Sequence, residues 1–119
     1  MENKLIPYEE EEQIAFVQWL ELMKLKFTSV PNSTWSPSYN QHRKNRAMGL
    51  RSGLPDLLVI VPHQGRKHLV FVEMKRIKDS KTAPEQSEWV KSLRECEGVD
   101  AKVCYGFEQA KLFIEEFIL

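Results

Sequence analysis

Hydrophobic and polar positions recur with a helical period in the first part of the chain. The pattern predicts a helix that Pro7 opens and that runs to about Lys26. Its apolar positions are Ile14, Phe16, Val17, Leu20 and Met23. The stretch KFTSV is rich in β-forming residues and stops before Pro31, which predicts a short strand leading into a loop. Residues 36–53 are polar and basic and contain glycine, so we expect a long loop there.

Two apolar stretches in the middle of the chain indicate strands. DLLVIVP and HLVFVEM are joined by HQGRK, which predicts an antiparallel hairpin. Thr82 followed by Glu85 resembles a capping box, so the next helix is expected to begin there and to end near Gly98. AKVCYG then predicts a strand, and FEQAKLFIEEFI a closing helix. The order α–β–β–β–α–β–α predicts one α/β domain over residues 1–119, with helices flanking a mixed β-sheet.

Charged residues lie at the ends of the two hairpin strands. Asp56 stands at the start of the first strand, and Glu73 and Lys75 share one face of the second because strand residues two apart point the same way. If the hairpin pairs tightly, Asp56 and Glu73 meet, and two carboxylates this close repel each other without a cation between them. Oxygen ligands favour Mg²⁺ or Mn²⁺. Met74 points inward, which leaves its backbone carbonyl as a further ligand. The alternative for each residue alone is an ordinary surface ion pair.

Two helical residues are candidates to complete this site. On a helical projection centred on Leu20, Glu9 is the one of the four consecutive glutamates that continues the buried line. Glu10 and Glu12 lie within one turn of it, and the helix has alternatively left the core by this point, so the assignment stays open. Gln86 shares an apolar face of the later helix, where a glutamine is either at the edge of the core or directed at a polar site.

The net charge of zero hides a basic block in the middle of the chain. No acidic residue lies between Leu22 and Pro55, and more cations follow between residues 66 and 81. A basic face of this kind suits DNA phosphates, although a solvated charged loop is the alternative. The predicted phosphate contacts are Arg43, Lys44, Arg46, Arg51 and Arg76. No stretch approaches the roughly 18 apolar residues of a membrane span, and the first residues do not resemble a signal peptide, so we expect a cytoplasmic protein without a membrane segment.

Taken together, these residues resemble the PD-(D/E)xK nucleases and, within them, the VRR-NUC branch. The stretches that carry the resemblance are EEEEQIAFVQWL, VPN, GLRSGLPDLLVI, FVEMKR and APEQSEWVKSL, in the family's order across nearly the whole chain. The resemblance implies a restriction-endonuclease-like core. It also implies that Glu9, Asp56 and Glu73 surround one or two Mg²⁺ or Mn²⁺ ions, with Glu9 bound directly or through water. Lys75 would position or activate the attacking water, and Gln86 would support the site.

The same resemblance implies a divalent-metal-dependent, structure-selective DNA endonuclease. Stand-alone members of the branch are similar to junction-resolving enzymes, which cut four-way (Holliday) junctions as symmetric dimers, so a homodimer is expected. Two alternatives stay open at this point. One is a flap or nicking nuclease that acts as a monomer, and the other is a non-catalytic DNA-binding module with the same fold.

Overall fold

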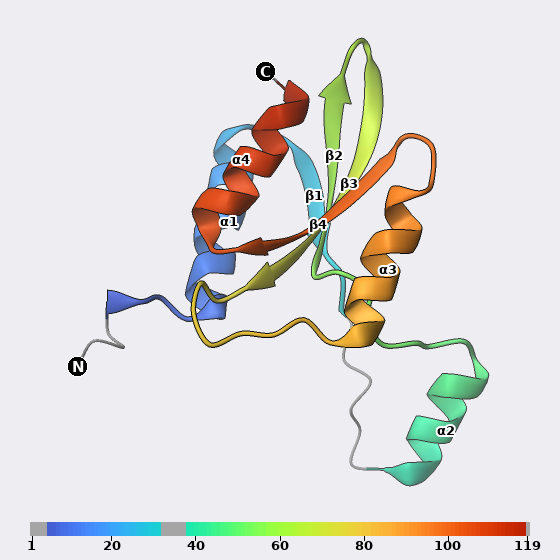
Figure 1. Ribbon diagram of the computed structural model, residues 1–119. Helices are drawn as coiled ribbons and strands as arrows, with labels where there is room; N and C mark the ends of the chain where they lie inside the picture. The colour runs from blue at the N-terminus through green and yellow to red at the C-terminus, as the bar shows by residue number, and fades with distance from the viewer. Residues whose placement is uncertain (1–4, 32–37, 119) are drawn as a thin grey trace.

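The computed structural model describes residues 5–31 and 38–118, and within them the chain forms four helices and four strands (Figure 1). In chain order these are α1 (Glu9–Leu22), β1 (Lys26–Ser29), α2 (Tyr39–Ala47), β2 (Leu57–His63), β3 (Arg66–Lys75), α3 (Pro84–Arg94), β4 (Val99–Tyr105) and α4 (Phe107–Ile118). The strands form one sheet in the order β1-β2-β3-β4. None of the helices in the described part of the chain is long and apolar enough to cross a membrane.

The sheet is mixed, as predicted. β1 and β3 both pair with β2 in antiparallel fashion, whereas β4 runs parallel to β3. The predicted hairpin between β2 and β3 turns through Gln64 and Gly65, whose φ angles of 51° and 79° suit a tight two-residue turn. The parallel connection from β3 to β4 needs a crossover, and α3 provides it.

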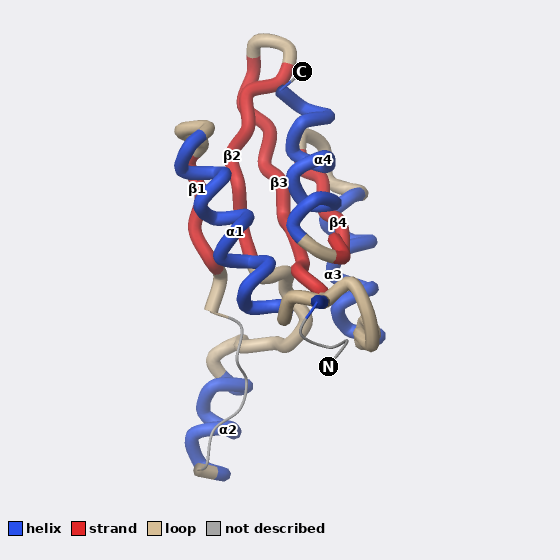
Figure 2. The backbone as a smooth tube through the Cα atoms, turned by 90° about the vertical axis from the view of Figure 1, so that its left-hand side faces the viewer, coloured by secondary structure: helices blue, strands red, loops and turns tan. Residues whose placement is uncertain are grey.

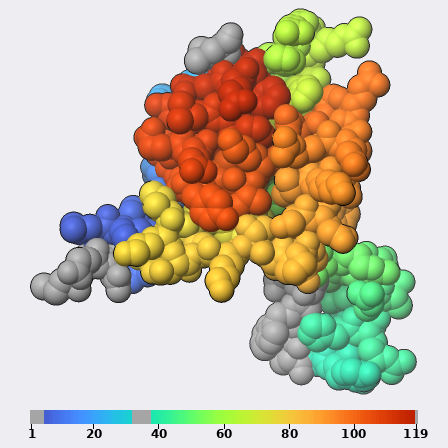
Figure 3. All heavy atoms as spheres, in the orientation of Figure 1, coloured from blue at the N-terminus to red at the C-terminus, as the bar shows by residue number. Residues whose placement is uncertain are grey.

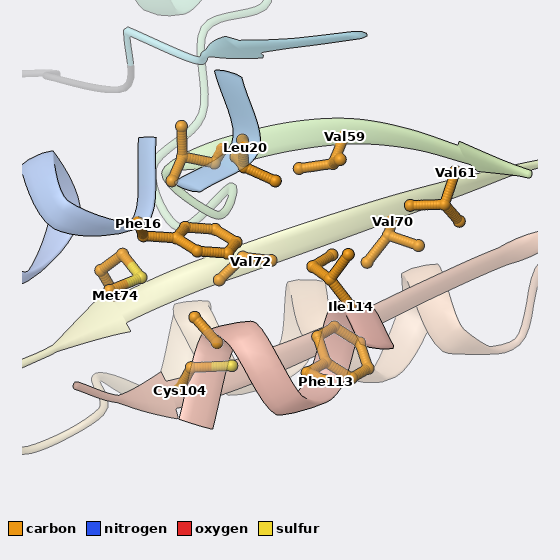
Figure 4. Close-up of a cluster of buried hydrophobic side chains, with 12 residues drawn as sticks. Phe16, Leu20, Val59, Val61, Val70, Val72, Met74, Cys104, Phe113 and Ile114 are labelled. Carbon is orange, nitrogen blue, oxygen red and sulfur yellow. The ribbon is translucent and has the colours of Figure 1, made fainter. Parts of the chain in front are cut away.

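Helices cover the two faces of the sheet as separate layers. α1 and α4 lie on one face and α3 lies on the other (Figures 1 and 2). On the first face Val72 and Met74 of β3 pack with Phe16 and Ile114 in the main core (Figure 4). On the second face Phe71 packs with residues of α3 and β4. The predicted alternation along β3 is therefore confirmed, and it directs Glu73 and Lys75 toward the α3 face.

The expected loop over residues 36–53 was wrong in part, because α2 lies within it. Ser38 Oγ accepts a hydrogen bond from Gln41 N (3.2 Å), and Gln41 Nε2 donates to Asn45 Oδ1 (2.7 Å). These local bonds support a helix that buries no residue, so no hydrophobic period marks it in the sequence. Figures 2 and 3 show α2 standing apart from the body of the domain, and in Figure 2 it lies beyond the end of the sheet opposite the β2–β3 turn.

The ends of two predicted helices also needed correction. α1 ends at Leu22 rather than near Lys26, because Lys24 adopts a φ of 59° and turns the chain toward β1. α3 begins after Ala83 and not at a Thr82–Glu85 capping box. The residue that bonds back to the helix start is Gln86, whose Oε1 accepts a hydrogen bond from Ala83 N (3.0 Å).

Candidate functional site

The predicted meeting of Asp56 and Glu73 follows from the register of the hairpin. Leu57 pairs with Val72, so the next step along the same antiparallel register places Asp56 opposite Glu73. β3 runs two residues beyond this point, and its Met74 amide donates to Asp56 Oδ2 (2.8 Å). The Asp56 side chain thus occupies the position at which β2 would otherwise have continued the ladder.

Glu73 is a buried carboxylate that is only half satisfied. The residue is 3% exposed. Its Oε2 accepts a hydrogen bond from Gln86 Nε2 (2.9 Å) and lies 3.5 Å from Lys75 Nζ. Its Oε1 is buried without a hydrogen-bond partner within the described part of the chain. A buried anionic oxygen without a partner is costly, so this atom marks a place where a cation would be stabilising.

Electrostatics at the site favour added positive charge. Burial, with a further contribution from the nearby Asp56 carboxylate, raises the pKa of Glu73 to about 7, although Lys75 acts in the opposite direction. Burial likewise raises the pKa of Asp56, against the Met74 amide and Lys75. The pKa of Glu9 is raised first by burial and then by Asp56. The three carboxyl groups, from α1, the start of β2 and the end of β3, are therefore close enough to disfavour one another's ionisation.

The four glutamates at the start of α1 differ in burial, and the prediction that Glu9 continues the buried line was wrong. The buried one is Glu12, at 7% exposure, whereas Glu9 is exposed. The buried line follows Glu12, Phe16 and Leu20 at intervals of four, because α1 packs on the sheet and beside α4. Glu12 Oε1 accepts a hydrogen bond from Phe107 N at the start of α4 (3.1 Å). Glu9 is the one of these glutamates that interacts electrostatically with Asp56 and Glu73.

Gln86 connects the site to α3 through both ends of its amide. Its Oε1 bonds the backbone at the start of the helix, and its Nε2 donates to Glu73. Of the two readings of this glutamine from sequence, the one directed at a polar site fits its contacts. Because one amide cannot rotate without losing both bonds, Gln86 holds the Glu73 carboxylate in a fixed orientation.

The donor atoms fit a hard divalent cation. Asp56 and Glu73 supply facing carboxylate oxygens, and Glu73 Oε1 has no hydrogen-bond partner among residues 5–31 and 38–118. The amide and carbonyl of one strand residue point to the same side, so the Met74 carbonyl is directed toward Asp56 as its amide is. Within residues 5–31 and 38–118 there is no close group of three or more His, Cys, Asp or Glu side chains that would hold a metal. Two carboxylates and a carbonyl, with waters, are the arrangement typical of Mg²⁺.

The basic residues predicted to contact phosphates fall into two sets. Arg43, Lys44 and Arg46 lie on the exposed α2. Arg51 and Arg76 instead direct side-chain donors at the backbone. The Arg51 guanidinium donates to the carbonyls of Arg46 and Leu50, both at 2.9 Å, and so closes the end of α2. The contacts of Arg76 are with the segment that precedes α1. These two arginines therefore have structural roles that the sequence pattern did not indicate.

Comparison with known proteins identifies the family to which the chain belongs. The family model described as "VRR-NUC domain" matches residues 3–108 of the chain. A solved structure described as "VRR_NUC domain protein" is similar in fold, with a TM-score of 0.73 and 24% sequence identity over 95% of this chain and 89% of that chain. No curated protein matches the chain. With the family model covering nearly all of the sequence, the chain belongs to the VRR-NUC domain family.

Proposed function

We propose that this protein is a divalent-metal-dependent DNA endonuclease that selects branched DNA such as four-way junctions. A nuclease-type function follows from the VRR-NUC domain itself. The observation that supports the metal dependence is the facing pair of Asp56 and Glu73. Glu73 Oε1 is buried without a hydrogen-bond partner in the described part of the chain, and the Asp56 carboxylate lies nearby. A salt bridge that served stability alone would not place a buried carboxylate opposite a half-buried one.

Each residue of the site has a distinct role in this proposal. Asp56, Glu73 and the Met74 carbonyl would hold Mg²⁺ or Mn²⁺ directly, and Glu9 would bind it through water. The chemistry that a bound ion would supply here is polarisation of the phosphate and a lowered pKa of the attacking water. Lys75 Nζ lies 3.5 Å from Glu73 Oε2, and in this proposal it donates to the phosphate as negative charge develops and does not act as a base. Gln86 keeps Glu73 oriented toward the cation.

The projecting α2 is the proposed DNA-binding arm. It carries Arg43, Lys44 and Arg46, has no acidic residue and buries no side chain in the domain. Because α2 buries no side chain, it contributes little to the stability of the domain. Binding of a partner by its exposed cations would explain why the helix is present. Contacts from such side chains would reach phosphates rather than base edges, which favours recognition of DNA shape over sequence.

A symmetric dimer follows from a junction substrate. Two matched cuts across a two-fold junction need two identical sites, so the proposed assembly is a C2 homodimer. Phe113 of α4 is excluded from its interface because it is 4% exposed and belongs to the core. Trp35 lies outside the described residues, and Tyr39 is 75% exposed on α2. Among these three residues, Tyr39 is therefore the one whose described position suits a contact between copies.

The test is cleavage of matched DNA substrates by the full chain. Four-way junctions, flaps, single strands and linear duplexes of shared sequence are incubated with Mg²⁺, Mn²⁺ or Ca²⁺, and the mass in solution is measured by sedimentation. We expect a dimer that cuts junctions in paired, nearly symmetric positions with Mg²⁺ or Mn²⁺ and not with Ca²⁺. Asp56→Asn and Glu73→Gln should abolish cutting but leave DNA binding intact, whereas Glu108→Gln, at an exposed position of α4, should cut normally.

Two other outcomes decide between the alternatives. A monomer that cuts flaps or single strands as readily as junctions would reject the junction and dimer assignments and leave a general nuclease. Binding of branched DNA without metal-dependent cutting of any substrate would identify a non-catalytic DNA-binding module.

A further inference from the structure

A second feature lies directly beside the candidate site. The residues before α1 and the loop over residues 76–83 enclose an open cleft of about 650 Å³. Its lining includes Tyr8, Glu9, Lys75, Arg76, Asp79 and Lys81. The N-terminal segment and this loop lie side by side in Figures 1 and 3. Because Glu9 and Lys75 belong both to the cleft and to the candidate site, a group bound in the cleft would lie next to the reacting phosphate.

Tyr8 and Arg76 form a stacked pair in this cleft. The Arg76 guanidinium carbon lies 4.9 Å from the centroid of the Tyr8 ring. The guanidinium is fixed from behind, because its Nε donates to Pro7 O (3.2 Å) and its Nη2 to Ile6 O (3.0 Å). Tyr8 is nevertheless 61% exposed. With Arg76 covering one face of the ring, this exposure leaves an aromatic surface open to the cleft.

The Tyr8 side chain has no role in starting the helix that follows it. The start of α1 is capped through the Tyr8 backbone amide, which donates to Glu11 Oε1 (2.9 Å), and the Tyr8 side chain makes no cap hydrogen bond. The helix therefore does not require an aromatic residue here. An exposed ring that is oriented by a twice-anchored arginine, and that α1 does not need as a cap, is better explained by a ligand that stacks on its open face.

The charges of the cleft indicate which part of a nucleic acid it would accept. Three basic and three acidic side chains line it, so the cleft does not attract phosphate as strongly as α2 does. An aromatic ring backed by a guanidinium is instead suited to an uncharged, planar nucleobase, which binds to single-stranded nucleic-acid proteins by stacking.

We infer that Tyr8 and Arg76 together form a shelf that stacks one unpaired nucleobase next to the scissile phosphate. This inference rests on the proposed nuclease function and extends it to how branched DNA is selected. Nucleotides at a branch point unstack more easily than those inside a duplex, because an intact duplex must break pairing and stacking to present a base. The shelf would therefore favour substrates with an unstacked base at the cutting position.

A fluorescent base tests the shelf without requiring cleavage. A four-way junction carrying 2-aminopurine at a branch nucleotide is titrated with the full chain in Ca²⁺, and the fluorescence change that reports stacking is measured with the affinity. We expect wild-type protein and Tyr8→Phe, which keeps the ring, to quench the probe equally. Tyr8→Leu, which keeps apolar bulk but has no aromatic face, should lose the quench and bind the junction about tenfold more weakly. Its affinity for linear duplex should not change.

The controls separate the shelf from the catalytic proposal. Leu112→Ala, at an exposed apolar position of α4, should retain the wild-type quench. Equal quenching by Tyr8→Leu and wild-type protein would overturn the shelf, and so would the absence of any quench by wild-type protein, even if cleavage with Mg²⁺ were normal. A quench that depends on Tyr8 in a protein that cuts no DNA would support the shelf and reject the nuclease function.

Discussion

Glu12 and Glu73 are the two buried charged side chains among the described residues, and they differ in what surrounds them. In each, one carboxylate oxygen accepts a hydrogen bond and the other is buried without a hydrogen-bond partner in the described chain. Glu12 faces the first backbone amide of α4, at the positive end of a helix dipole. Glu73 faces a second carboxylate, that of Asp56. Burial alone therefore does not distinguish a structural acid from a functional one.

What distinguishes them is whether the fold compensates the negative charge. At Glu12 the backbone at the start of α4 supplies partial positive charge. The Glu12 carboxylate therefore does not require a bound ion. Among the described residues, the full positive charge near Glu73 is that of Lys75, and two further carboxyl groups oppose it. The pKa of Glu73 is raised to about 7, which is the response expected of an acid whose charge lacks compensation. The negative charge of Glu73 is thus uncompensated in the metal-free site, whereas the start of α4 compensates that of Glu12.

Neutralising each glutamate and measuring DNA cleavage with Mg²⁺ tests whether Glu73 and Glu12 differ in function. Glu73→Gln should lower the cleavage rate by about a thousandfold or more, because an amide cannot replace a carboxylate as a ligand of a hard cation. Glu12→Gln should stay within about threefold of wild type, because its amide oxygen still accepts from Phe107 N. Similar losses from both variants would show that Glu12 also takes part in the chemistry.

Stability as a function of pH should show the same difference without DNA. In metal-free protein the pKa of Glu73 is raised from 4.5 to about 7, so between these values the folded state binds more protons than the unfolded state. Rising pH then favours unfolding, and Glu73 should cost up to about 3 kcal/mol by pH 8 relative to pH 4. Urea unfolding in EDTA should show that Glu73→Gln removes this loss. A wild-type stability that rises steadily with pH relative to this variant would contradict a raised Glu73 pKa.

Lys75 tests whether the cation beside Glu73 serves the fold or the reaction. Lys75→Ala should lower the turnover rate by about a hundredfold, because positive charge at this position matters most as charge develops on the phosphate. Its effect on Mg²⁺ affinity should be smaller, since removing a cation does not weaken the attraction of the carboxylates for metal. Calorimetric Mg²⁺ titration beside single-turnover kinetics separates the two. An unchanged rate with weaker DNA binding would reduce Lys75 to a phosphate contact.

The sequence predicted the strand half of the site better than the helical half. A strand has a period of two, so the opposite directions of Met74 and its neighbours Glu73 and Lys75 follow from local geometry alone. The burial of Glu12 depends on how α1 crosses α4, which is tertiary information that a helical projection does not contain. α2 escaped prediction for a related reason, because its supporting hydrogen bonds are local and polar and leave no hydrophobic period.

The smallest expected effect concerns the structural member of the pair. Glu12→Ala removes the acceptor for Phe107 N and leaves that amide buried at the start of α4, so the free energy of unfolding should fall by about 2 kcal/mol. Glu12→Gln keeps an acceptor oxygen and loses only the interaction between a full charge and the helix dipole, which is worth about 0.5–1 kcal/mol. Glu10→Ala, at an exposed position in the same turn, is the matched control and should change the stability by less than about 0.5 kcal/mol.

The order of these three variants in stability shows whether the Glu12 carboxylate caps α4. If its carboxylate acts as a cap, stability measured by urea unfolding must fall from the Glu10 variant through Glu12→Gln to Glu12→Ala, because each step removes more of the interaction with α4. If Glu12 were an uncompensated acid like Glu73, Glu12→Gln would instead stabilise the protein at pH 8 by removing a costly buried charge. The sign of the Glu12→Gln effect, opposite to the stabilisation expected of Glu73→Gln in EDTA, therefore decides whether the fold compensates this charge.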